Sequence, residues 1–113
     1  MVGDEKNLVN LSFLYQKTMD KGAAKELIEY FINNVQFFLN ESNLAIERKE
    51  FSALYKFAQK IETGAKHIYS EKIIDIASDI EFSSLENDFD RASFNLQLLD
   101  EAVNDLKNIQ KVM

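Results

Sequence analysis

The chain lacks cysteine and proline, and its 113 residues include only three glycines and one histidine. Without cysteine it can form no disulfide and carry out no thiol chemistry, which fits a reducing compartment. The shortage of helix breakers and of turn residues for hairpins favours an all-helical protein without a β-sheet. A chain of this length predicts a single domain, residues 1–113, built around one core.

Long apolar runs are also missing. No segment approaches the roughly 18 to 20 apolar residues of a membrane span. The first ten residues, MVGDEKNLVN, carry charges where a secretion signal would need an apolar stretch, so we expect a soluble cytoplasmic protein. The net charge of −6 and the pI near 4.8 oppose binding to nucleic acid or to anionic lipid. The expected partners are therefore proteins.

Apolar residues recur at helical spacing along the whole chain. The pattern predicts a short helix through LSFLYQKTMD, capped by Asn10 or Ser12 and followed by Gly22 in a left-handed conformation. Four longer helices are expected at about 23–49, 50–68, 71–85 and 90–111, with Ser70 capping the third of these. Short connections between long amphipathic helices imply antiparallel neighbours. We therefore predict an up-and-down antiparallel four-helix bundle with a short extra N-terminal helix.

Each long helix has an apolar stripe that should face the core. In the first long helix the stripe is Ile28, Phe31, Ile32, Val35, Leu39, Ser42 and Ile46. The second has Phe51, Leu54, Phe57, Ala58, Ile61, Ala65 and Ile68, and the third has Ile73, Ile76, Ala77 and Ile80. The last has Phe94, Leu98, Leu99, Ala102, Leu106 and Ile109.

The first long helix carries two aromatic residues on the side away from its apolar stripe. Tyr30 and Phe37 are seven residues apart and roughly opposite the centre of their helix's apolar stripe. We expect the short N-terminal helix to cover them with Leu8, Leu11 and Phe13. The alternative is an exposed contact surface, since apolar patches on such domains mark partner sites.

The helix over residues 50–68 has a polar outer face centred on Gln59. With Gln59 at 0° and 100° per residue, the core positions of this helix cluster between about 160° and 260°. Gln59 therefore points into solvent, beside Ser52, Tyr55, Lys56, Glu62, Thr63 and Lys66. Gly64 lies in the helix interior, where we expect it to allow close approach of a neighbouring helix.

The segment LYKFAQKIETGAK resembles the second bundle helix of histidine-containing phosphotransfer (HPt) domains, which reads approximately L-x-x-x-A-H-x-L-K-G-S-A. The resemblance extends from NLSFLYQK to IIDIASDIE and thus over nearly the whole chain. It implies a four-helix bundle with a short N-terminal helix, and partners that are response-regulator receiver domains or hybrid histidine kinases. Ala58 and Ile61 match the family pattern.

The active positions of the family pattern are altered. Gln59 stands where the family has its phosphate-carrying histidine, Glu62 where it has a lysine, and Thr63 where it has a small residue. A carboxamide nitrogen has given its lone pair to the carbonyl, so Gln59 cannot act as a nucleophile. Two like charges 4 Å apart cost about 4 kcal/mol at an effective dielectric near 20, so Glu62 would repel a phosphoryl group. Both changes oppose phosphotransfer.

We therefore expect a non-catalytic pseudo-HPt module of two-component phosphorelay signalling, monomeric rather than oligomeric, without metal or cofactor. Its partner-binding surface would be Tyr55, Lys56, Gln59, Glu62, Thr63 and Lys66. A second interpretation is an active relay intermediate using His67, which lies about 80° around the helix from Gln59 and roughly 12 Å further along it. A third is a structural or oligomeric bundle that associates through Tyr30 and Phe37.

Overall fold

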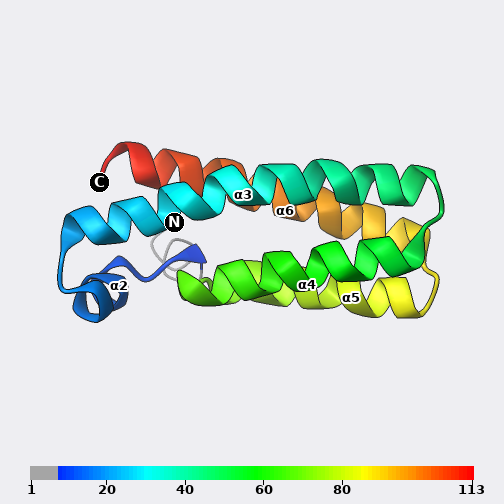
Figure 1. Ribbon diagram of the computed structural model, residues 1–113, viewed down its shortest axis with the longest axis horizontal. Helices are drawn as coiled ribbons and strands as arrows, with labels where there is room; N and C mark the ends of the chain where they lie inside the picture. Colours follow the sequence, from blue (N-terminus) through cyan, green and yellow to red (C-terminus); the bar gives the residue numbers. More distant parts are fainter. Residues whose placement is uncertain (1–7) are drawn as a thin grey trace.

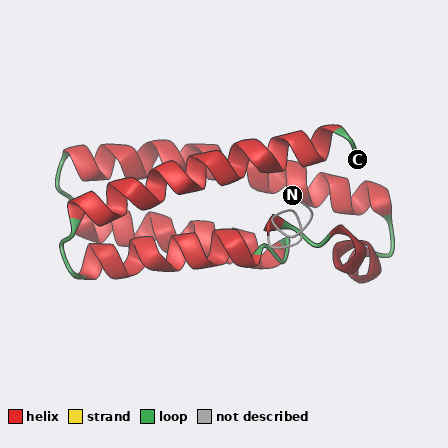
Figure 2. Ribbon diagram, turned by 180° about the vertical axis from the view of Figure 1, so that it is seen from behind, coloured by secondary structure: helices red, strands yellow, loops and turns green. Residues whose placement is uncertain are grey.

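The computed structural model describes residues 8–113, which contain five α-helices and no β-strand. Figure 2 shows these helices joined by short loops. The all-helical class predicted from the scarcity of helix breakers is confirmed. The short first helix is α2 (Leu11–Thr18). The four long helices are α3 (Lys21–Glu47), α4 (Phe51–His67), α5 (Glu71–Leu85) and α6 (Phe89–Lys111), and their bounds agree with the expected ones to within two residues.

The four long helices lie side by side, and α2 lies at one end of them (Figure 1). Each long helix packs against the next one in the chain, and α6 also packs against α3. The molecule is 42 Å long and 24 by 20 Å across. A helix of 27 residues, the length of α3, spans about 40 Å, so α3 alone runs nearly the full length of the molecule. None of the helices within residues 8–113 is both long and apolar enough to cross a membrane.

The three turns between the long helices share one construction. Lys49, Tyr69 and Asn87 each follow a helix end with a left-handed φ of 56°. In each turn the next backbone N–H donates to a carbonyl five residues earlier, as when the N–H of Glu50 donates to Ala45 O over 2.8 Å. This is the Schellman arrangement, which satisfies carbonyls that a helix end leaves free. It reverses the chain within three residues and thereby places consecutive helices next to each other.

The residue that completes each turn also begins the next helix. Ser70 accepts a hydrogen bond from the N–H of Ile73 over 3.3 Å, which confirms Ser70 as a cap. Asp88 accepts one from the N–H of Arg91 over 3.1 Å. These side chains satisfy N–H groups that the first turn of a helix cannot pair internally.

The connection before α3 differs from the prediction. Gly22 was expected to take the left-handed conformation, but it lies inside α3, and no glycine among residues 8–113 has a positive φ. Met19 takes that conformation instead. Asp20 starts α3 two residues earlier than expected, because its carboxylate accepts a hydrogen bond from the N–H of Gly22 over 2.8 Å. Asn10 is confirmed as the cap of α2.

The apolar stripes form one buried cluster. Most of the expected inward residues of α3, α4 and α5 are buried; Ile46, Phe51 and Phe57 are partly buried. In α6 the expectation for Phe94 was wrong, since its side chain is 59% exposed. The expected Leu99, Ala102 and Leu106 are buried, and Leu98 and Ile109 are half-buried. The rest of the α6 core comes from Ala92, Leu96 and Val103, which lie about 160° to 200° around the helix from Phe94.

A polar network joins α5 to α6. The Asp79 carboxylate accepts hydrogen bonds from Arg91, one of them from Nε over 3.1 Å, and from the buried Asn95 amide. These bonds, chiefly those from Arg91, hold the pKa of Asp79 below its ordinary value. A depressed carboxyl pKa stabilises the fold at neutral pH, and the contribution is lost as the pH falls through the folded-state pKa.

We predict that Lys49→Gly stabilises the protein by about 0.5 to 1 kcal/mol, because glycine takes the left-handed conformation without the steric cost of a Cβ. Equilibrium urea unfolding monitored by circular dichroism measures the change. The matched control is Lys25→Gly, at an exposed position inside α3, which should destabilise by about 1 kcal/mol. A loss of stability in both variants would contradict the account of the turn.

Candidate functional site

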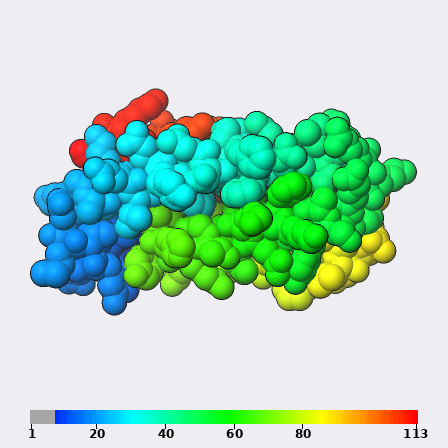
Figure 3. Space-filling model, in the orientation of Figure 1, coloured from blue at the N-terminus to red at the C-terminus, as the bar shows by residue number. Residues whose placement is uncertain are grey.

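A groove of about 840 Å³ lies between α3 and α4. Figure 3 shows this face, with the cyan surface of α3 lying along the green surface of α4. One wall consists of α3 side chains: Leu27, Tyr30, Phe31, Asn34, Val35 and Phe38. The other consists of α4 residues: Lys56, Gln59, Lys60, Ile61, Glu62, Thr63, Gly64, His67 and Ile68. We call this hollow the α3–α4 groove.

Gly64 of α4 lies directly against Phe31 of α3. A Cβ placed on Gly64 would lie 3.1 Å from Cδ1 and 3.2 Å from Cε1 of the Phe31 ring. That spacing is tighter than ordinary contact between carbon atoms, which lies at 3.5 Å or more. The absence of a side chain at Gly64 therefore lets Phe31 pack against the α4 backbone. The expectation that Gly64 allows close approach of a neighbouring helix is confirmed.

Gln59 lies on the outer ridge of α4 with its side chain exposed, as the helical periodicity predicts. Lys56 and Thr63, one turn on either side, are also exposed and line the groove together with Gln59. The Thr63 hydroxyl donates a hydrogen bond to the Gln59 carbonyl over 3.0 Å. Two other predicted site residues, the half-buried Tyr55 and the exposed Lys66, do not line the groove.

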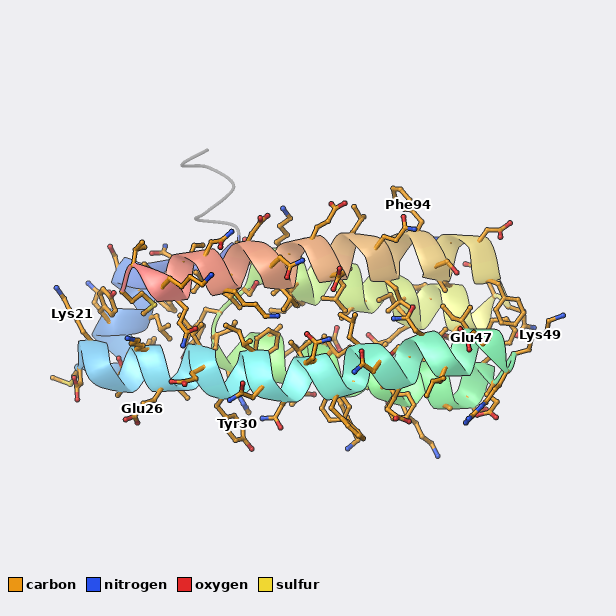
Figure 4. All side chains as sticks on the ribbon, turned by 90° about the horizontal axis from the view of Figure 1, so that it is seen from above. Lys21, Glu26, Tyr30, Glu47, Lys49 and Phe94 are labelled. Carbon is orange, nitrogen blue, oxygen red and sulfur yellow. The ribbon has the colours of Figure 1, made fainter. Side chains whose placement is uncertain are left out.

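The structure brings Tyr30 to the same site as Gln59. Its side chain is 72% exposed and projects from the side of α3 opposite α6 (Figure 4). Phe37 is 57% exposed and does not line the groove. Its ring lies 5.5 Å, between centroids, from the ring of Phe38, which does line the groove. The expectation that the N-terminal helix covers Tyr30 and Phe37 was wrong.

The physical reason is the position of α2. It lies across the end of α3, where Leu14 is fully buried and Phe13 packs edge-to-face on Tyr69 at 4.8 Å. The apolar side of α2 thus packs against the end of the helical bundle, and α2 does not cover the outer face of α3. Sequence reasoning treated Tyr30 and Gln59 as separate features. Two signals in the sequence could have placed Tyr30 and Gln59 at one site: the short turn after α3, which makes α3 and α4 neighbours, and Gly64, which allows the two helices to approach closely.

Glu62 faces α5 as well as the groove. Burial raises the pKa of Glu81 in α5 above its ordinary value, and the nearby Glu62 carboxylate raises it further, while Lys66 acts in the opposite direction. Two carboxylates and one ammonium group therefore meet between α4 and α5. Adding a third anion beside them would be unfavourable, because like charges repel more strongly at a partly desolvated surface.

The side chains that line the groove offer hydrogen-bonding and charged groups. Its polar walls offer amide, hydroxyl and ammonium groups, and Gln59 has no lone pair suited to nucleophilic attack. His67 is exposed at the end of α4 and lines the same groove. Within residues 8–113 no group of three or more His, Cys, Asp or Glu residues is arranged to hold a metal ion.

Comparison of the chain with protein-family models, with curated proteins and with solved structures gives no match.

We predict that Glu81→Gln stabilises the protein at pH 7 by about 0.5 kcal/mol, a size typical of like-charge neighbours on helices. Because the folded-state pKa of Glu81 is raised, its proton favours the folded state, so wild-type stability falls as the pH rises above the ordinary value of 4.5. The gain from the substitution should therefore shrink toward pH 4. Thermal unfolding at both pH values measures it. Equal gains at both would contradict a raised pKa of Glu81, whose causes are burial and the Glu62 carboxylate.

Proposed function

We propose that this chain is an HPt-like protein of two-component phosphorelay signalling that binds a receiver domain or a hybrid histidine kinase without accepting phosphate. In this proposal α3, α4, α5 and α6 form the up-and-down antiparallel four-helix bundle of the family, and α2 is its short N-terminal helix. The protein acts in the cytoplasm, by competition for a partner or as a scaffold. It is not an enzyme.

The observation that carries the proposal is the position of Gln59. The helix with the family-like segment LYKFAQKIETGAK presents Gln59 outward on the rim of an open groove, with Tyr30 on the opposite wall. A receiver domain docked in the family manner would present its aspartate to Gln59. Exposed Lys56, Lys60 and His67 on the α4 wall favour a partner surface that carries negative charge.

The same surroundings oppose phosphate transfer. Gln59 supplies no nucleophile, and Glu62 with Glu81 places two carboxylates on the side where the family has its lysine. The groove therefore keeps features useful for docking, while the groups that would accept and neutralise a phosphoryl group are replaced. A decoy or scaffold needs only the docking features.

A relay role for His67 remains a second candidate because His67 is exposed in the same groove. A receiver domain would have to dock roughly 12 Å further along α4 to reach it. Incubation with phosphorylated receiver domains tests this directly. Acid-labile label that disappears in His67→Ala would establish the relay, and unlabelled protein would leave the binding role.

We predict that Thr63→Arg weakens receiver binding at least about 100-fold, because a long charged side chain at the middle of the groove blocks close approach. Gln59→Ala should change the affinity by less than about threefold, because truncating an exposed side chain leaves the groove open. Affinity capture from a lysate of the source organism, followed by mass spectrometry, identifies the receiver domain. Its affinity for each variant is then measured by biolayer interferometry.

Ser93→Arg in α6 is the matched control, since it adds the same charge at an exposed position outside the groove. It should bind the captured receiver domain as the wild type does. Equal affinities of Thr63→Arg and Ser93→Arg would overturn docking in the α3–α4 groove. Capture of no receiver-containing protein by the wild type would overturn the proposed partner class.

A further inference from the structure

The net negative charge of the chain is concentrated in its C-terminal part. Residues 71–113 contain ten Asp and Glu but only four Lys and Arg, whereas residues 1–70 contain nine of each kind. The entire charge of −6 therefore belongs to α5, α6 and the residues next to them. An uneven distribution of this kind produces a local field that attracts partners of opposite charge.

A second groove, of about 540 Å³, lies between α5 and α6. Four exposed carboxylates line it, two from each helix: Glu71, Asp75, Glu101 and Asp105. Ile76 and the half-buried Leu98 give it an apolar floor, and Lys72 is its one basic residue. Within residues 8–113 the ion pairs are those of Arg91 with Asp79 and Glu86, so none involves these four carboxylates.

Exposed aromatic residues extend this surface along both helices. On α6, Phe94, Leu98, Glu101 and Asp105 recur at spacings of four, three and four and so form one stripe. On α5, Glu71, Asp75 and Phe82 form a matching stripe. Phe82 is 55% exposed, and Phe94 projects from the side of the molecule opposite Tyr30 (Figure 4). We call these two stripes together the α5–α6 face.

The arrangement of charges restricts what this face can bind. The carboxylates are too far apart to hold one metal ion, since no suitable group of three exists within residues 8–113. Anionic surfaces would be repelled. A row of separate cations would be attracted, and Lys or Arg side chains could lay their apolar stems over Ile76 and Leu98 while their charges reach the rim. Two adjacent helical stripes also offer the groove into which a third helix packs.

We propose that the α5–α6 face binds a cationic amphipathic helix of a partner protein. Apolar residues of that helix contact Phe82, Phe94 and Leu98, and its Lys or Arg residues pair with Asp75, Glu101 and the carboxylates beside them. The face lies on the far side of the molecule from the α3–α4 groove, so both can be occupied together. The proposal does not depend on the function proposed for that groove.

The test uses a synthetic peptide of about 18 residues, made of lysine and leucine with the leucines on one helical face, which spans about 27 Å. Isothermal titration calorimetry with the whole chain measures its affinity. A peptide of the same composition in scrambled order, which has no apolar face, should bind about tenfold more weakly. Equal binding of the two peptides would reduce the interaction to net charge and overturn the proposal.

Two double variants with equal net charge locate the site. Asp75→Asn with Glu101→Gln should weaken binding of the amphipathic peptide about tenfold, because both carboxylates would pair with lysines. Glu26→Gln with Glu29→Gln, on exposed positions of α3, should weaken it less than about twofold. Phe94→Ser should weaken it while its salt dependence stays unchanged. Equal losses in the two double variants, or NMR shifts confined to the α3–α4 groove, would overturn the proposal.

Discussion

The contact between Gly64 and Phe31 is the constraint on which the candidate site depends. A Cβ on Gly64 would come within 3.1 Å of the Phe31 ring, so any other residue would require that ring to shift by a few tenths of an ångström. The approach of α3 and α4 places Tyr30 on the wall opposite Gln59 and forms the base of the α3–α4 groove. A larger residue at position 64 would have to displace the Phe31 ring or move the two helices apart. The shape of the groove and the packing of the core thus both depend on Gly64.

Most of the fold could be predicted from the sequence because apolar residues repeat at helical spacing and few helix breakers interrupt them. The turns could not be predicted in detail. Their left-handed residues are Lys49, Tyr69 and Asn87, and neither lysine nor tyrosine signals that conformation. Glycine does signal the left-handed conformation, but Gly22 lies inside α3 because Asp20 caps the helix just before it. In these turns the hydrogen bonds of the helix end outweigh the cost of an unfavourable backbone angle.

The candidate site was predictable only within one helix. Periodicity placed Gln59 and Thr63 correctly on the outer face of α4, since a single helix needs no tertiary information. The neighbouring wall with Tyr30 depends on how α3 packs, which periodicity does not give. Phe94 was misplaced for a related reason: the apolar arc of α6 is wide enough that periodicity did not show which edge is buried, and the structure buries the edge with Leu96 and Val103. The aromatic residue left outside became part of the acidic α5–α6 face.

Whether α4 presents a docking face of the phosphotransfer type is tested most directly by introducing the histidine and the lysine that the HPt pattern has at positions 59 and 62. The double variant Gln59→His with Glu62→Lys should bind the captured receiver domain and take acid-labile phosphate from its phosphorylated form, while the wild type takes none. Imidazole supplies the nucleophile, and lysine replaces the carboxylate that repels the phosphoryl group. A double variant that binds the receiver domain as tightly as the wild type and still acquires no label would show that the partner does not dock over Gln59.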